Sequence, residues 1–286
     1  MSSIKLVKIN NATVNQLPNY ESKEDRRPIL GADLFPELYS NIFLCAKKKS
    51  GKTTVIYNII KKCANKNTKV VAFVSTIDKD KSWLTIREFC ERNEIQFMGH
   101  SSTYDSEGNN ILQDMINQLA MKAEEERLAI EKAKMDKNMP AQLVAFFAEA
   151  DDCKEDEEEK KKKLPKYQSP EYLFIFDDLS DELRRNKAVA SFAKKHRHYK
   201  SKCIYSSQYA KDLDPQTLKQ MDYIILFKGE NDEKLKHLYE NADLSITLPE
   251  FMDLYHKAVN SKPYAFLYID RVNNSFRICF DQSIKL

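Results

Sequence analysis

Residues 41–54 read NIFLCAKKKSGKTT, an apolar run followed by a lysine-rich loop that ends in Gly-Lys-Thr-Thr. The apolar run predicts a buried strand, and the loop matches the Walker A pattern between a strand and a helix. Such a loop points backbone N–H groups at phosphates, and the helix start adds partial positive charge. We expect Lys52 to reach the β- and γ-phosphates of a nucleoside triphosphate, and the Thr53 hydroxyl to bind Mg²⁺. The expected phosphate-binding residues are Ala46, Lys47, Lys48, Lys49, Ser50, Gly51, Lys52, Thr53 and Thr54.

The flanking sequence supports this interpretation over a lysine-rich surface turn. Apolar residues recur with helical spacing from Val55 to Cys63, and the continuous apolar run at 69–74 suits a central parallel strand. Ala46 departs from the pattern, which usually has a glycine there to relax the turn. A methyl group is a small intrusion, so a phosphate loop remains the expected structure.

A second apolar run, EYLFIFDD at 171–178, ends in two carboxylates. A buried strand that delivers a carboxylate at its C-terminal end is the Walker B arrangement. Asp177 is expected to hold Mg²⁺, and Asp178 to polarise the attacking water. An aspartate after a strand also serves as a helix N-cap, so the signal depends on the Walker A loop upstream. Gln208 follows another apolar run and is placed either to contact the γ-phosphate or merely to end a strand.

The remaining pattern predicts an α/β fold with a mostly parallel central sheet and helices on both faces. Further strands are expected at 4–9, 95–98, 223–227, 264–269 and 275–280, and helices at 82–92 and 109–135. Residues 1–36 are interpreted as an N-terminal arm and 37–286 as one ATPase domain. A charged helical insertion is expected at about 121–170, with a short helix at 141–150. It is either a lid, a subunit contact or a DNA-facing arm, or simply a solvated excursion.

Composition limits the possible environments. The net charge is only +3, so no global basic field indicates nucleic acid. The six cysteines show neither zinc spacing nor a disulfide framework, which favours a reducing compartment. No stretch has the length and apolar character of a membrane span, and the N-terminus does not read as a signal peptide.

The chain resembles the poxvirus-type DNA-packaging ATPases of the FtsK–HerA superfamily, found in large DNA viruses, virophages and virus-like transposons. The resemblance covers about residues 40–230. It rests on the loop 46–54, on the strand ending in Phe-Asp-Asp-Leu at 176–179, and on HRHYKSKCIYSSQ at 196–208. In the third stretch the family places an Arg-His pair, a short strand and a glutamine. Pro215 and Lys219 match the proline and basic residue that follow, although an arginine is common at the latter position.

The resemblance implies a RecA/FtsK-like P-loop NTPase with an additional strand between the two Walker strands. It implies hydrolysis of ATP with Mg²⁺ in a homo-oligomeric ring, expected to be a pentamer or hexamer, that moves double-stranded DNA into a preformed capsid. Capsid or portal-vertex proteins are the implied partners. The host cytoplasm or a viral factory is the implied location, with the virion as a further one.

Carried over by position, Gln208 is the implied γ-phosphate sensor and Arg197 a candidate arginine finger that reaches a neighbouring subunit. Arg197 also fits the basic end of a helix, where cations complement the dipole. Arg184 and Arg185 are rival fingers.

Other P-loop classes fit less well. Nucleoside and nucleotide kinases of similar size carry an arginine-rich lid, whereas the insertion contains one arginine, Arg127. A HerA-type helicase would have an additional N-terminal barrel, for which 40 residues do not suffice. A scaffold without activity would be expected to lose Lys52 or the aspartate pair, and both are present. A packaging motor is therefore the leading hypothesis, with a kinase or another nucleic-acid-dependent NTPase such as a helicase as the alternative.

Overall fold

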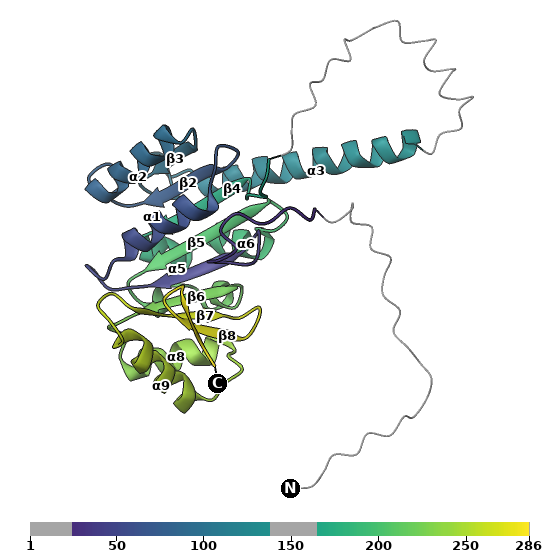
Figure 1. The fold of residues 1–286 in the computed structure, drawn as a ribbon. Coiled ribbons are helices and arrows are strands. Elements are labelled where there is room, and N and C mark those ends of the chain that lie inside the picture. Colours follow the sequence, from purple (N-terminus) through teal and green to yellow (C-terminus); the bar gives the residue numbers. More distant parts are fainter. Residues whose placement is uncertain (1–24, 138–164, 286) are drawn as a thin grey trace, which may run out of the picture.

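The computed structural model describes residues 25–137 and 165–285. Within them, nine strands form one sheet in the order β3-β2-β4-β5-β1-β6-β7-β8-β9 (Figure 1). The strands are β1 Asn41–Cys45, β2 Lys69–Val74, β3 Gln96–His100, β4 Tyr172–Asp177, β5 Ser201–Ser207, β6 Tyr223–Phe227, β7 Phe266–Asp270, β8 Ser275–Ile278 and β9 Gln282–Ile284. The helices are α1 Lys52–Cys63, α2 Lys81–Arg92, α3 Ile111–Lys137, α5 Ser180–Arg185, α6 Lys187–Lys195, α7 Pro215–Leu218, α8 Asp232–Ala242 and α9 Leu248–Val259.

The order of the strands fixes where the two carboxylates lie relative to the phosphate loop. Strand β5 pairs in parallel with both β1 and β4, so one strand separates the two expected Walker strands. Six strands, from β3 to β6, are parallel, and their carboxyl ends meet at one edge of the sheet. The predicted mostly parallel sheet with an additional strand is confirmed.

The C-terminal strands run the other way. Strand β7 is antiparallel to β6, with Phe227 opposite Phe266, and β8 and β9 continue the antiparallel order. The start of β7 therefore lies at the same edge as the end of β6. The sequence analysis found β7 and β8 but did not predict the short, exposed strand β9.

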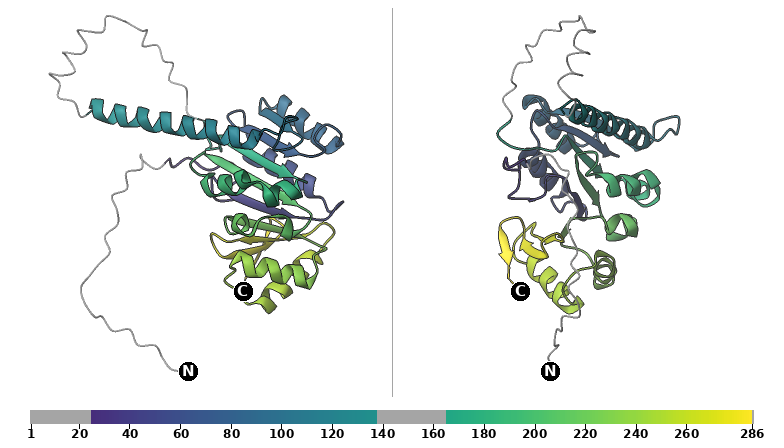
Figure 2. Two further views of the ribbon diagram at one scale, coloured as in Figure 1. Left: turned by 180° about the vertical axis from the view of Figure 1, so that it is seen from behind. Right: turned by 90° about the vertical axis from the view of Figure 1, so that its right-hand side faces the viewer.

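Helices cover both faces of the sheet, as predicted (Figure 2). The side chains of β1 alternate between two core clusters, one on each face of the sheet. Phe43 belongs to the cluster that includes residues of α3, α5, α6, α8 and α9, whereas Ile42 and Leu44 belong to the cluster that includes residues of α1 and α2. All five residues of β1 are buried, as expected for a parallel strand covered on both sides. None of the helices in the described parts of the chain combines the length and apolar character needed to cross a bilayer.

Helix α3 begins in the core and extends away from it (Figure 1). Its first turns bury Leu112 and Ile116, and ion pairs anchor the next ones. Lys122 Nζ lies 2.7 Å from Glu171 Oε2, and Lys200 Nζ lies 2.7 Å from Glu126 Oε2. The predicted helix 109–135 is confirmed to within two residues. The predicted strand 4–9, the predicted helix 141–150 and the rest of the expected insertion between 138 and 164 lie outside the described residues.

Residues just before β1 pack against the sheet through a buried lysine. Lys202, the second residue of β5, is fully buried. Its Nζ donates to the Glu37 carbonyl at 2.7 Å and to Ser40 Oγ at 3.3 Å. Burial lowers the pKa of Lys202. Phe35 is also fully buried, and the Tyr268 hydroxyl donates to the Leu34 carbonyl. These contacts fix the segment that leads into β1, the strand that ends at the phosphate loop.

Candidate nucleotide-binding site

The loop between β1 and α1 has the backbone of a phosphate-binding loop. Gly51 has φ 91°, a left-handed conformation that L side chains rarely adopt, and it lies immediately before α1. Ala46 is buried and its N–H donates to the Ser207 carbonyl at 3.0 Å, so the core accommodates the methyl group in place of the usual glycine. No side chain caps the start of α1. The first N–H groups of the helix therefore lack a side-chain acceptor and suit an anion.

Lys52 joins the phosphate loop to the end of β4. Its Nζ lies 2.9 Å from Asp177 Oδ1 and 2.5 Å from Asp178 Oδ1. The three side chains differ in exposure: Lys52 is 10% exposed, Asp177 3% and Asp178 35%. Lys52 thus bridges a buried carboxylate and one that faces the cleft.

Burial and attraction act in opposite directions on this cluster. For Lys52, burial disfavours the charge, but attraction by Asp177 and hydrogen bonds to both carboxylates outweigh it and raise the pKa. For Asp177, burial raises the pKa, and attraction by Lys52 offsets this only in part. The lysine is therefore held firmly as a cation.

The local backbone aims Asp178 at the cleft. Asp178 follows β4 directly and has φ 54°, a left-handed conformation that aspartate tolerates better than most residues. A strained backbone between a strand and a helix is typical of functional sites. Gln208 Nε2 approaches Asp178 Oδ1 at 3.4 Å from the end of β5. The structure thus brings together Lys52, Asp177, Asp178 and Gln208 from three segments distant in sequence.

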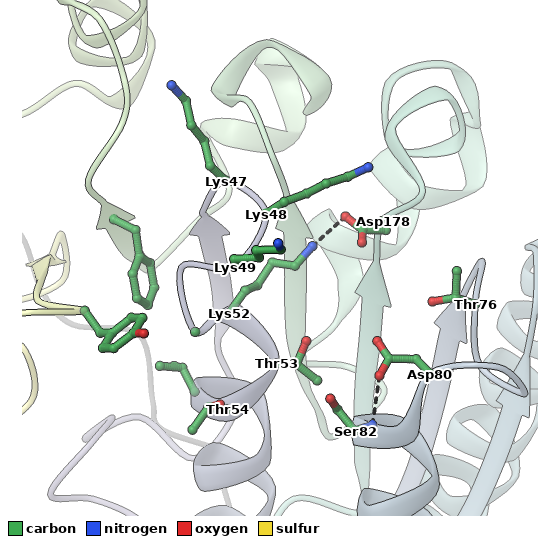
Figure 3. Close-up of a pocket in the computed structure, with 14 residues that line it drawn as sticks. Lys47, Lys48, Lys49, Lys52, Thr53, Thr54, Thr76, Asp80, Ser82 and Asp178 are labelled. Carbon is green, nitrogen blue, oxygen red and sulfur yellow. Dashed lines mark hydrogen bonds and ion pairs between the residues drawn. The ribbon is translucent and has the colours of Figure 1, made fainter.

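A cleft of about 790 Å³ opens above the loop (Figure 3). Asp178 lines it, whereas Asp177, which is buried and paired with Lys52, does not. The lining residues that the sequence analysis predicted are Lys47, Lys48, Lys49, Gly51, Lys52, Thr53, Thr54 and Asp178. Those that it missed are Val55, Thr76, Asp80, Ser82, Phe227 and Tyr264.

The missed residues come from two sides of the loop. Thr76, Asp80 and Ser82 follow β2, and Asp80 caps α2 by accepting from the Ser82 N–H at 2.8 Å. The rule that ligands bind at the carboxyl ends of parallel strands could have indicated this segment. Phe227 ends β6 and Tyr264 precedes β7. The hydrophobic pattern of the sequence did not indicate that the antiparallel strand β7 would start beside the phosphate loop.

Arg197 lies at the opposite edge of the sheet from the cleft. It precedes β5, and its Nη2 lies 3.0 Å from Oδ1 of Asp222, which precedes β6. The side chain of Arg197 is 60% exposed. It therefore does not line the nucleotide cleft of its own chain. Arg184 and Arg185 lie in the last turn of α5, the short helix that follows Asp178. Neither lines the cleft, and Arg184 lines a separate cavity with Lys211 and Glu233.

The fold and this cleft define the class of the protein: an α/β P-loop fold with an additional strand between the two Walker strands. A family model described as Poxvirus A32 protein matches residues 129–285, more than half of the chain. The chain therefore belongs to the Poxvirus A32 protein family. The match includes the Asp177-Asp178 pair and Gln208 but not the phosphate loop.

Individual proteins are similar to the chain in fold or in sequence. The structure of the genome packaging NTPase B204 from Sulfolobus turreted icosahedral virus 2, in complex with AMP, is similar with a TM-score of 0.50 and 15% identity, over 85% of this chain and 97% of that one. B204 from Sulfolobus turreted icosahedral virus, described as a DNA-packaging ATPase, has a TM-score of 0.49 at 17% identity, over 85% and 98% of the two chains. The uncharacterized protein 075L of Invertebrate iridescent virus 6 is 31% identical over 105 residues, 36% of this chain and 40% of that protein. The chain thus matches about two fifths of the length of that curated relative.

Proposed function

We propose that the protein is an ATP-driven motor that translocates double-stranded DNA into preformed viral capsids. The observation that carries the proposal is the position of Lys52, which emerges from the phosphate loop and bridges Asp177 and Asp178 two strands away. The family membership and the fold shared with B204, described as a genome packaging NTPase, support the coupling to DNA.

The cluster suggests how hydrolysis proceeds. The terminal phosphates of ATP compete with the two carboxylates for Lys52, because they too are anionic and lie over the loop. Withdrawal of Lys52 frees Asp178, which then accepts a proton from the attacking water. Asp178 suits this role because it is the more exposed carboxylate of the pair. Gln208, which touches Asp178, is placed to sense the γ-phosphate and to report its loss.

The donor set of the site fits Mg²⁺. Thr53, which lines the cleft, contributes a hydroxyl, and Asp177, which is paired with the neighbouring Lys52, contributes a buried carboxylate. Magnesium typically takes one or two protein oxygens, with phosphates and waters completing its shell. When bound, the ion neutralises charge on the β- and γ-phosphates. Asp177 and Thr53 would hold it there.

The rival activities can be compared with these contacts. Arg127, the one arginine of the predicted insertion, is paired with Glu124 and Glu131 on its own helix rather than with the cleft. This arrangement gives no support to a kinase with an arginine-rich lid.

The decisive test of the motor is ATP hydrolysis by the purified protein with and without double-stranded DNA. We expect DNA to stimulate phosphate release at about 50 mM salt and much less at about 200 mM, because contacts to DNA phosphates weaken with salt. Phosphate release that DNA does not change at either salt concentration would contradict a motor. Transfer of phosphate to an added nucleoside or nucleotide, instead of to water, would support the kinase.

The ring proposal places Arg197 at the site of a neighbouring subunit. Arg197 lies at the opposite edge of the sheet from the cleft of its own chain, so a role as an arginine finger requires action in trans. We expect Arg197→Ala and Asp178→Asn proteins to be inactive separately and to regain part of the ATPase activity when mixed. In some interfaces of a mixed ring, an intact Asp178 faces an intact Arg197, and such an arginine strongly stabilises the transition state.

A matched control mixes Asp178→Asn with Lys52→Ala, because both changes lie in the same half of the interface and no pairing repairs them. Arg197→Lys keeps a cation beside Asp222 and tests whether the forked guanidinium matters. If subunits exchange but no mixture recovers activity, Arg197 serves its own subunit by holding Asp222. Arg184 and Arg185 then become the candidates for the same assay.

A further inference from the structure

A second cavity lies beside the nucleotide cleft and shares a wall with it. It has a volume of about 500 Å³ and is lined by Ser50 of the phosphate loop, by Lys228 after β6 and by residues 259–265 before β7. Phe227 and Tyr264 line both the cleft and this second cavity. We propose that this second cavity binds the purine base of the nucleotide, with the ring of Tyr264 as its stacking surface.

The direction of the bound nucleotide follows from the strand order, provided that the proposed ATPase function is right. Lys52 and Asp178 mark the γ-phosphate end, toward β4 on one side of β1. The ribose and base must leave the loop on the other side, where β6 and β7 lie. The residues on the β2 side, Thr76, Asp80 and Ser82, are polar and offer no aromatic surface.

Tyr264 is held over the phosphate loop by the antiparallel pairing of β6 and β7. Phe227 lies opposite Phe266, which places Tyr264 just beyond the end of the ladder. A Cβ atom added to Gly51 would lie 3.7 Å from Tyr264 Cδ1, so the ring stands against the last residue of the loop. A base attached to phosphates on this loop is thereby within reach of Tyr264.

The conformation of Tyr264 has no evident role in packing. The residue is 71% exposed, the largest exposed fraction among the large hydrophobic residues that are described. Its φ is 60°, a left-handed conformation that is unusual for a bulky residue. Strain of this kind often accompanies a binding function. An exposed aromatic ring offers a base a face on which to stack, and the hydroxyl edge tolerates water.

The rest of the cavity suits a flat heterocycle with polar edges. Phe227, Val259 and Ala265 are buried and provide apolar wall. Lys228 Nζ donates to Asn260 Oδ1 at 2.8 Å, which orients the amide and leaves its Nδ2 available as a donor. Ring nitrogens or carbonyl oxygens of a purine would accept from it. Most ligand pockets likewise combine apolar walls with a few polar groups.

The test compares ATP with inorganic tripolyphosphate, which has three linked phosphates but neither ribose nor base. The key variant is Tyr264→Asn, because asparagine removes the ring but tolerates the left-handed backbone. We expect it to weaken ATP binding about tenfold, the loss typical of one base–aromatic contact, and to leave tripolyphosphate binding unchanged. Tyr264→Phe should bind ATP like the unchanged protein. Tyr104→Asn, at an exposed tyrosine that lines neither cavity, is the control.

Each other outcome overturns the proposal. Unchanged ATP affinity in Tyr264→Asn would place the base elsewhere. Equal weakening of both ligands would mean that Tyr264 only supports the phosphate loop, and equal affinity of the unchanged protein for both ligands would mean that no base is recognised. The comparison needs neither hydrolysis nor DNA. A protein that binds ATP through Tyr264 but ignores DNA would therefore contradict the motor and leave the base cavity standing.

Discussion

Replacement of Lys52 by alanine is expected to lower kcat for ATP hydrolysis by a factor on the order of a hundred to a thousand. Lys52 is the cation that the structure places between the phosphate loop and both carboxylates. Without it, charge that develops on the transferred phosphate loses its nearest fixed positive partner. The measurement is phosphate release under saturating ATP, and nucleotide binding should weaken as well. Lys61→Ala, on the exposed face of the same helix, is the matched control.

The same variant has a second readout in its stability. Loss of Lys52 leaves Asp177 buried without its cation, so its folded-state pKa, already raised by burial, rises further. A folded state that binds protons more tightly than the unfolded state becomes less stable as pH rises. The Tm of Lys52→Ala should therefore fall relative to that of Lys61→Ala as pH rises from about 4 to neutrality. Unchanged turnover together with an unchanged Tm would remove Lys52 from the site.

The predictions that held depend on continuous apolar runs. Strands β1, β2, β4 and β6 were found because buried parallel strands need apolar side chains on both faces. Their carboxyl ends share one edge, so the approach of Lys52 to Asp177 and Asp178 followed from the motifs and the topology together. Helix α3 was found because its apolar positions recur with helical spacing.

What the sequence could not indicate depends on pairing between distant segments. Periodicity finds β7 but not its direction, and only the direction puts Tyr264 beside Gly51. Likewise, the sequence showed the basic residues around Arg197, but it did not indicate that Arg197 pairs with Asp222 at the edge of the sheet opposite the cleft. The buried Lys202 gave no signal at all, because a lysine within a strand normally predicts an exposed position. The roles proposed for Asp178, Gln208 and Arg197 remain predictions.

Asp178→Asn is expected to keep the binding of ATP and Mg²⁺ while hydrolysis falls by a factor on the order of a hundred to ten thousand, the usual contribution of a general base. Asparagine is the right replacement for two reasons. It has the shape of aspartate without the basic oxygen, and it tolerates the left-handed backbone at φ 54°. Lys52 keeps its contact with Asp177, so the phosphate loop should retain its cation in place.

Single-turnover hydrolysis and nucleotide binding, measured on the same preparation, separate loss of the base from loss of the site. Asp181→Asn changes an exposed aspartate three residues further on, at the start of α5, and should match the unchanged protein in both measurements. Weakened ATP binding in Asp178→Asn would instead show that this carboxylate organises the site through Lys52. Normal hydrolysis by Asp178→Asn would assign the base elsewhere, and Asp177→Asn would then be the next variant. Asp177 is the weaker candidate because it is buried and paired with Lys52, so that an attacking water has little access to it.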